Sequence, residues 1–258
     1  MPLPLHVEIR GDGPPLVLLH GFTQTGRLWG SFGDGLAEVR TLVAVDLPGH
    51  GGSDAVRADL PESAALVVEA VRGVVGGGEP VELLGYSLGA RVALHVVTGT
   101  YLAVAKLVTI GAHGGMEDAE VRAARRVGDE ATADALEASG DVGAFVDRWL
   151  AGPMFARLGD DAAEREERLR NSAAGLASSL RLAGTGTQGP LWDAMAGVGS
   201  PLLAVAGSDD QRFGAHAMRL ARVTPHAVAS LVPGGGHAAH LGQPAITLRL
   251  VRHWLTTT

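Results

Sequence analysis

The stretch "VELLGYSLGARVALHVV" (residues 81–97) sets an apolar run against a glycine-rich turn and then continues as a helical pattern. Two glycines, Gly85 and Gly89, flank Ser87 at the turn. Apolar residues recur at helical spacing after it: Leu88, Val92 and Val96. This context predicts a strand, a sharp turn that presents the serine hydroxyl, and a buried helix. The Gly-x-Ser-x-Gly pattern alone is weak in a chain with 37 glycines, so the flanking pattern carries the prediction.

The same order of apolar strand followed by polar loop recurs along the chain. We expect strands in "LHVEI" (5–9), "PPLVLLHGF" (14–22), "RTLVAVDLPGHGGSD" (40–54), "AKLVTIG" (105–111), "SPLLAVAGSDD" (200–210) and "HAVASLVPGGGH" (226–237). Helices are expected from about Pro61 to Val75 and in "PAITLRLVRHWL" (244–255). Strands that alternate with helices favour parallel pairing, so the predicted fold class is α/β with a doubly wound, mostly parallel sheet.

Residues 113–199 break this alternation, because they contain charged helical segments and no strand-like run. We therefore predict a helical cap at 113–199, inserted between a first core part at 1–112 and a second at 200–258. The cap should lie over the carboxyl ends of the strands, where α/β folds bind their ligands.

Composition restricts the function further. The formal charge of -7 argues against a nucleic-acid partner, which would need clustered cations. The chain has no cysteine, no apolar run of 18 residues and no leader pattern at its start, so we expect a cytoplasmic protein without membrane insertion. No His/Asp/Glu spacing suggests a metal site, and no cofactor is expected. The sequence leaves the oligomeric state open between monomer and dimer.

Three strand ends supply Ser87, Asp210 and His237 in that chain order, which is the order of an α/β-hydrolase triad. In such a triad the histidine takes the serine proton and the carboxylate orients the histidine. The backbone amides of Phe22 and Leu88 are the expected oxyanion donors.

Neighbouring residues leave alternatives at two of these positions. Asp209 could replace Asp210 as the acid, and His240 could replace His237. Three other loop histidines are expected to hydrogen-bond to the backbone rather than to transfer protons: His20, His50 and His113. Asp46 is expected to anchor its loop in the same way.

Arginines surround the predicted triad. Arg91 follows Ser87 by one helical turn, so its side chain can reach the same cleft. Further arginines fall on the helices of the insertion: Arg122, Arg125, Arg126, Arg168 and Arg170. Several guanidinium groups near a serine triad favour a small-molecule substrate with more than one carboxylate.

Eight stretches of the chain resemble one family across nearly the whole length. They are "LLHGFTQTGRLW", "VDLPGHGGSD", "LGYSLGARVAL", "AEVRAARRVGDE", "DRWLAGPMFARL", "GTGTQGPLWDAM", "AGSDDQRF" and "PGGGHAAH". Together they resemble the SHCHC synthases of menaquinone biosynthesis, which are members of the α/β-hydrolase superfamily. The resemblance implies an α/β-hydrolase fold with a helical cap. It also implies a lyase that eliminates pyruvate from the enolpyruvyl-cyclohexene carboxylate SEPHCHC to give SHCHC, with no cofactor.

The resemblance also implies roles for individual residues. Ser87 would act as the base that removes a ring proton, with His237 and Asp210 raising its basicity, and the Phe22 and Leu88 amides would hold developing negative charge. Substrate binding would fall to Tyr86, Arg91, Arg125, Trp149 and Arg168. Arg170 competes with Arg168 for its position.

Two other functions compete with the lyase. The first is a serine hydrolase, either a carboxylesterase or a C–C bond hydrolase, in which Ser87 attacks a carboxylate-bearing substrate covalently. The second is a ligand-binding protein that has kept the pocket without turnover.

Overall fold

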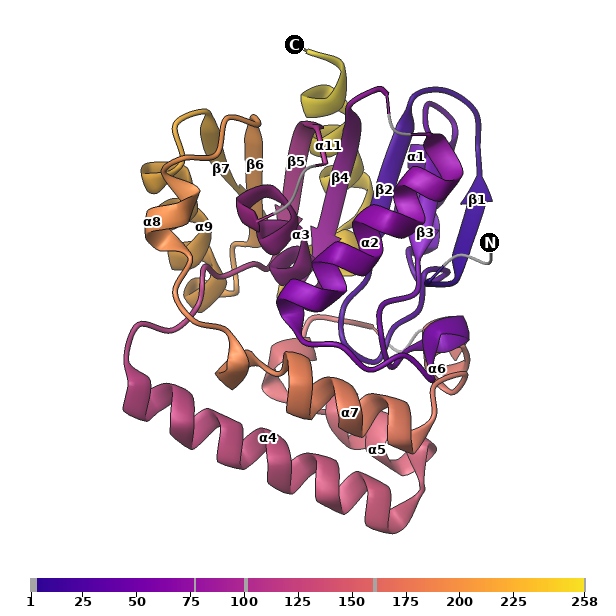
Figure 1. Ribbon diagram of the computed structural model, residues 1–258. Coiled ribbons are helices and arrows are strands. Elements are labelled where there is room, and N and C mark those ends of the chain that lie inside the picture. Colours follow the sequence, from indigo (N-terminus) through magenta and orange to yellow (C-terminus); the bar gives the residue numbers. More distant parts are fainter. Residues whose placement is uncertain (1–3, 77, 100–101, 160–161, 258) are drawn as a thin grey trace.

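A seven-stranded sheet runs through the centre of the molecule (Figure 1). The computed structural model describes residues 4–76, 78–99, 102–159 and 162–257. The strands are β1 (Val7–Arg10), β2 (Pro15–Leu19), β3 (Thr41–Val45), β4 (Val81–Tyr86), β5 (Val104–Ile110), β6 (Leu202–Gly207) and β7 (Ala227–Val232). Their order across the sheet is β1-β3-β2-β4-β5-β6-β7. β1 is antiparallel to β3, and the other pairings within the described residues are parallel. The α/β prediction is confirmed.

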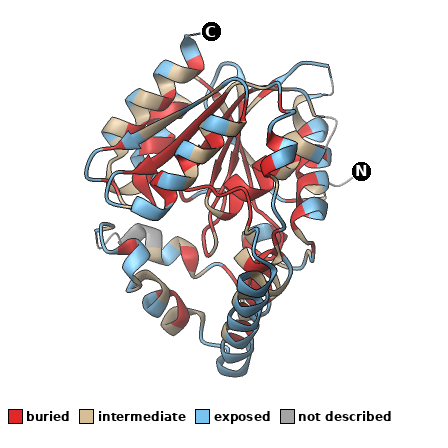
Figure 2. Ribbon diagram, turned by 90° about the vertical axis from the view of Figure 1, so that its left-hand side faces the viewer, coloured by how far each residue is buried: buried red, intermediate tan, exposed pale blue. Residues whose placement is uncertain are grey.

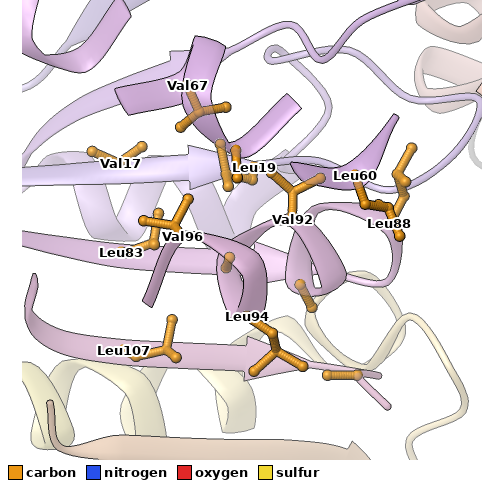
Figure 3. Packing of buried hydrophobic residues seen from close by; sticks show 14 of the residues in the cluster. Val17, Leu19, Leu60, Val67, Leu83, Leu88, Val92, Leu94, Val96 and Leu107 are labelled. Atoms are coloured by element: carbon orange, nitrogen blue, oxygen red, sulfur yellow. The ribbon is translucent and has the colours of Figure 1, made fainter. Parts of the chain in front are cut away.

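Helices cover both faces of the sheet, because its strands are apolar on both sides. The flanking helices are α1 (Gly30–Ala37), α2 (Leu60–Val75), α3 (Leu88–Gly99), α9 (Gln211–Val223), α10 (Ala239–Gly242) and α11 (Pro244–Thr256), and a short 3-10 turn, η1, spans Gly51–Ser53. Val17 and Leu19 of β2 belong to the core that also contains residues of α2 and α3, as Figure 3 shows. Leu16 and Leu18 belong to the opposite core, which contains residues of α1 and α11. Strands buried on both faces read as continuous apolar runs, which explains the sequence pattern.

The start of α2 is set by local chemistry. The Asp59 side chain accepts a hydrogen bond from the Glu62 amide, and the Glu62 carboxylate accepts one from the Asp59 amide. Pro61 stands in the first turn, where its missing N–H is harmless. The predicted start at Pro61 is therefore only one residue late.

A second group of helices stands between β5 and β6. It comprises α4 (Ala119–Ser139), α5 (Val142–Leu150), α6 (Ala162–Arg168), α7 (Ala173–Ala183) and α8 (Trp192–Met195), with 3-10 turns η2 (Pro153–Phe155) and η3 (Thr185–Thr187). In Figure 1, α4, α5 and α7 lie below the sheet, beyond the carboxyl ends of its parallel strands. Figure 2 shows the buried strands enclosed by helices with exposed outer faces, and α4 is exposed along most of its length.

These helices have a small apolar core of their own. It is formed by Ala133, Leu136, Phe145, Leu176, Ala177 and Leu180. Phe22, from the loop after β2, and Trp149 of α5 pack against this core. Their rings meet edge to face with centroids 5.1 Å apart, so the group of helices contacts the main body next to the loop that carries Phe22.

Candidate active site

Ser87 occupies a strained turn between β4 and α3. Its φ of 50° lies in the left-handed region, which non-glycine residues seldom adopt. The turn needs glycine on both sides: a Cβ on Gly85 would lie 2.4 Å from the Gly89 carbonyl oxygen, and one on Gly89 would lie 2.0 Å from the Leu19 carbonyl oxygen. The Ser87 amide donates to the Ile110 carbonyl at 2.9 Å, which fixes the turn against β5. The sequence pattern therefore reports a close approach of three backbone segments.

Of the three side chains predicted as a triad, His237 lies within hydrogen-bonding distance of both Ser87 and Asp210. His237 Nε2 lies 3.0 Å from Ser87 Oγ, and His237 Nδ1 lies 3.2 Å from Asp210 Oδ2. With its proton on Nδ1, His237 donates to Asp210 and can accept the Ser87 proton. His237 is buried, and its ring packs on Phe213 with centroids 4.3 Å apart. The geometry is that of a serine polarised by an imidazole and a carboxylate.

The two alternative residues are engaged elsewhere. Asp209 forms an ion pair with Arg157 at 2.8 Å and accepts from the Ser208 hydroxyl. His240 is buried against the rings of Trp29 and Tyr86, and burial lowers its pKa to about 3. A histidine held neutral in an apolar site is a packing residue, so the geometry favours Asp210 and His237.

Opposing effects act on the Asp210 carboxylate. Burial raises its pKa, but the hydrogen bonds from His237 and from the Phe213 amide, together with the nearby charge of Arg212, lower it by more. The net pKa lies below the usual range of an aspartate. Asp210 is therefore ionised at neutral pH, as a residue that orients an imidazole must be.

Phe22 and Leu88 both border the space in front of Ser87. Within the described residues, neither backbone amide has a hydrogen-bond acceptor in the protein. Leu88 is the first residue of α3, where helix geometry leaves the N–H unpaired. Two such donors beside a serine can stabilise a developing oxyanion.

The loop that carries Phe22 is held by buried polar contacts. His20 accepts from the Leu47 amide at 3.0 Å and donates to the Gly21 carbonyl at 2.8 Å, and burial lowers its pKa to about 4. Asp46 accepts from the amides of Gly26 at 2.6 Å and Gly52 at 2.7 Å. The predicted backbone-holding role is confirmed for these two residues and extends to His50 and His113, which contact the Pro48 carbonyl and the Gly115 amide.

A cavity opens in front of Ser87, between the sheet and the α4–α7 helices. Its walls include both triad residues nearest the space, Ser87 and His237, and the side chains of Arg91, Arg125 and Trp149. The structure thus brings residues from α3, α4 and α5 to the same cavity, next to Ser87.

The two arginines differ in their surroundings. Arg91 is buried, donates to the Gly184 carbonyl at 3.2 Å, and has its pKa lowered to about 10 by burial. Arg125 is 38% exposed and donates from Nε to Asp129 at 2.8 Å. Guanidinium groups are effectively always protonated, so two arginines in its lining make the cavity attractive to anions.

Two of the predicted substrate-binding residues do not line this cavity. Tyr86 is absent from its lining, and its ring centroid lies 5.4 Å from that of His237. Arg168 is buried behind the Phe22 loop, where its Nη1 donates to Thr23 Oγ1. Arg170 is exposed and pairs with Glu167 at 3.2 Å. Of these two competing arginines, Arg168 is the one directed into the protein.

Arg212 is a charged cavity residue that the sequence pattern did not single out. It stands at the start of α9 and lines the same space as Ser87. It stands two positions after Asp210 in "GSDDQRF", and this proximity to the predicted triad acid was a signal that could have identified it.

Among the residues that the structure describes, no three His, Asp or Glu side chains come close enough together to bind a metal ion. No helix there combines the length and apolarity required to cross a bilayer.

Known proteins resemble this chain in both sequence and structure. Residues 16–250 match the alpha/beta hydrolase family. A 2-succinyl-6-hydroxy-2,4-cyclohexadiene-1-carboxylate synthase of Klebsiella pneumoniae is 34% identical, covering 91% of each chain. One of Escherichia coli is 32% identical, covering 93% of this chain and 94% of its own. The solved structure of MenH from S. aureus has a TM-score of 0.89 and 25% identity, covering 97% of each chain.

Both the sequence and the fold agree with the resemblance predicted from the eight motifs. The chain therefore belongs to the alpha/beta hydrolase family and, within it, to the family of the 2-succinyl-6-hydroxy-2,4-cyclohexadiene-1-carboxylate (SHCHC) synthases.

Proposed function

We propose that this protein is an SHCHC synthase that eliminates pyruvate from SEPHCHC in menaquinone biosynthesis. The observation that carries the proposal is the shared cavity: a serine 3.0 Å from an imidazole faces the same space as two arginines. A neutral ester needs no such cations, whereas a substrate with several carboxylates does. The similarity to named SHCHC synthases over more than nine-tenths of the chain supports the same conclusion.

The triad serves as a base in this reaction. His237 withdraws the Ser87 proton, and the resulting oxygen removes a proton from the substrate ring. The electron pair of the broken C–H bond forms the new ring double bond and expels the enolpyruvyl oxygen. The C–O bond breaks, the enolate of pyruvate leaves, and protonation at carbon converts it to pyruvate. No acyl-enzyme forms.

The other site residues would stabilise charge and fix the ring. The amides of Phe22 and Leu88 are proposed to bind the oxygen on which negative charge develops during proton removal. Arg91 and Arg125 are proposed to bind carboxylates that the product retains, and Trp149 to pack against the ring. Tyr86 is proposed to hold the ring of His237 in place, since the two rings pack with centroids 5.4 Å apart.

Pyruvate release from enzymatically generated SEPHCHC tests the function. We expect the wild-type protein to accelerate release well above the spontaneous rate, and Ser87→Ala to lower kcat about 1,000-fold. Ser230→Ala, on β7 away from the cavity, is the matched control and should retain full activity. A wild-type rate equal to the spontaneous rate would remove the proposal.

The charge requirement gives a second test. Arg125→Ala should raise KM for SEPHCHC about tenfold, because a charge-assisted contact is lost at a partly exposed site. Arg126→Ala, one residue further along α4 and exposed, should leave KM unchanged.

The competing function is a serine hydrolase, since the strained Ser87 and the two unpaired amides would also suit acyl transfer. It predicts a burst of product and a phosphonate adduct at Ser87, with little loss in Arg125→Ala on a neutral ester. Turnover of SEPHCHC without a burst would exclude it for this substrate.

Two predictions from the sequence form part of this proposal. Residues 113–199 are proposed to act as a cap over the cavity, to which α4 and α5 contribute Arg125 and Trp149. The cytoplasmic location can be checked by fractionating cells that express the chain.

A further inference from the structure

Arg212 stands at the junction of two cavities. It lines the space in front of Ser87 and also an adjoining open cavity bordered by Pro153, Met154, Ala156, Arg157 and residues 209–213. The two cavities share His237 and Phe213 as well, so they meet beside the triad. Arg212 therefore lies between the reaction site and a second opening.

The guanidinium group of Arg212 has no carboxylate partner within the described residues. It lies over the ring of Phe213, 5.7 Å from the centroid, which orients it without neutralising it. The other cation of the adjoining cavity, Arg157, is already paired with Asp209 at 2.8 Å. Arg212 is exposed and can therefore take up an incoming anion at little desolvation cost.

The carboxylates of the proposed substrate outnumber the arginines predicted to receive them in this cavity. SHCHC carries two carboxylates, one on the succinyl group and one on the ring, and the pyruvate that leaves carries a third. Arg91 and Arg125 line the cavity, whereas Arg168, the third arginine implied by the family resemblance, lies behind the Phe22 loop. Arg212 is the third arginine that lines this cavity among the described residues.

We propose that Arg212 binds the carboxylate of the enolpyruvyl group, the part of the substrate that leaves as pyruvate. This inference rests on the proposed function and specifies which end of the substrate faces the second opening. The leaving group gains negative charge on its enolate oxygen as the C–O bond breaks, so a cation at its carboxylate favours departure. The adjoining cavity then provides the released anion with a path that does not cross Arg91 and Arg125.

The test compares substrate and product in the same variants. Arg212→Gln should raise KM for SEPHCHC about tenfold, because one charge-assisted contact is lost. The inhibition constant of SHCHC should stay unchanged, since SHCHC lacks the third carboxylate. Arg125→Gln should instead weaken both by similar factors. Arg212→Lys should recover part of the affinity, because lysine keeps the charge but not the paired donors.

Arg222→Gln is the matched control, since it removes the same charge from the exposed last turn of the same helix. It should change neither constant. An unchanged KM in Arg212→Gln, or an equal loss for substrate and product, overturns the inference while leaving the lyase function intact. A shift confined to the acid limb of the kcat profile also overturns it, because Arg212 would then act only through Asp210. Absence of wild-type turnover overturns both.

Discussion

Asp129 accepts a hydrogen bond from Arg125 Nε at 2.8 Å, one helical turn away on α4, and its carboxylate is buried. The same carboxylate opposes the effect of burial on the pKa of Arg91. Asp129 is thus a shared counter-charge for Arg91 and Arg125. It leaves the terminal nitrogens of Arg125 available to a ligand while fixing the base of the guanidinium group.

Asp129→Asn should lower the free energy of unfolding by about 1 to 3 kcal/mol, because the buried Arg91 and the half-buried Arg125 lose their counter-charge. Urea denaturation measures the change. Glu130→Gln, the exposed next residue on α4, should cost less than about 0.5 kcal/mol. Equal losses in the two variants would show that burial of Asp129 is irrelevant.

Gly89→Ala should lower the free energy of unfolding by about 3 kcal/mol or more, because the new methyl group would lie 2.0 Å from the Leu19 carbonyl oxygen. Thermal and urea denaturation both measure this loss of stability. Gly99→Ala on the same helix meets no atom within 4 Å, so it should stabilise by about 0.5 to 1 kcal/mol. A Gly89→Ala protein as stable as the wild type would contradict the close approach of the three backbone segments.

Acid should destabilise the protein through its buried histidines. Burial lowers the pKa of His240 to about 3, so the native state holds this ring neutral, while the unfolded chain protonates it below the usual histidine pKa of 6.5. The unfolded state then binds more protons, and stability falls as the pH decreases from 6.5 towards 3. Each such histidine lowers the free energy of unfolding by up to about 1.4 kcal/mol for each pH unit of acidification in this range.

His240→Phe should therefore flatten the decline in unfolding free energy between pH 6 and pH 4.5 by about 1.4 kcal/mol per unit. The slope is the readout, because the new ring also changes packing against Trp29 and Tyr86. His226→Gln removes an exposed histidine and should leave the slope as in the wild type. An unaltered slope in His240→Phe would mean that this ring is protonated in the native state.

Arg168→Met should lower kcat with little change in KM for SEPHCHC, because Arg168 holds Thr23, the neighbour of Phe22, through a hydrogen bond to its hydroxyl. Thr23 has a φ of 67°, so its conformation depends on such contacts. Steady-state kinetics separates this from direct substrate binding, which would raise KM instead. Arg170→Met changes an exposed arginine on the same segment and should behave as the wild type.

The sequence predicted the elements of the sheet and the residues at their ends with small errors. The strand expected at 105–111 is found at Val104–Ile110, and the strand of 226–237 spans Ala227–Val232. Apolar runs and glycine turns are local signals, so they can be recognised in a single sequence without any knowledge of packing. The expected parallel pairing of the strands was also found. A helix that connects two strands brings the chain back to the end of the sheet where the first strand began, so the second strand runs in the same direction.

The cavity was harder to predict, because its members come from helices whose mutual placement is not local. Arg168 and Arg170 could not be separated by spacing, and only packing turns one inward and the other to solvent. Arg212 was overlooked because nothing in "DDQRF" states that the first turn of α9 faces the space in front of Ser87.

The sequence by itself determined the order of the functional residues along the chain: the serine turn with its two flanking glycines, then the acid, then the histidine. Each is marked by an apolar run followed by a polar or glycine-rich turn, a signal that lies within a few residues. Only the tertiary structure decided which of two adjacent aspartates orients His237 and which arginines share a cavity with Ser87. Adjacent side chains leave the backbone in different directions, and long-range packing alone decides which direction faces the site.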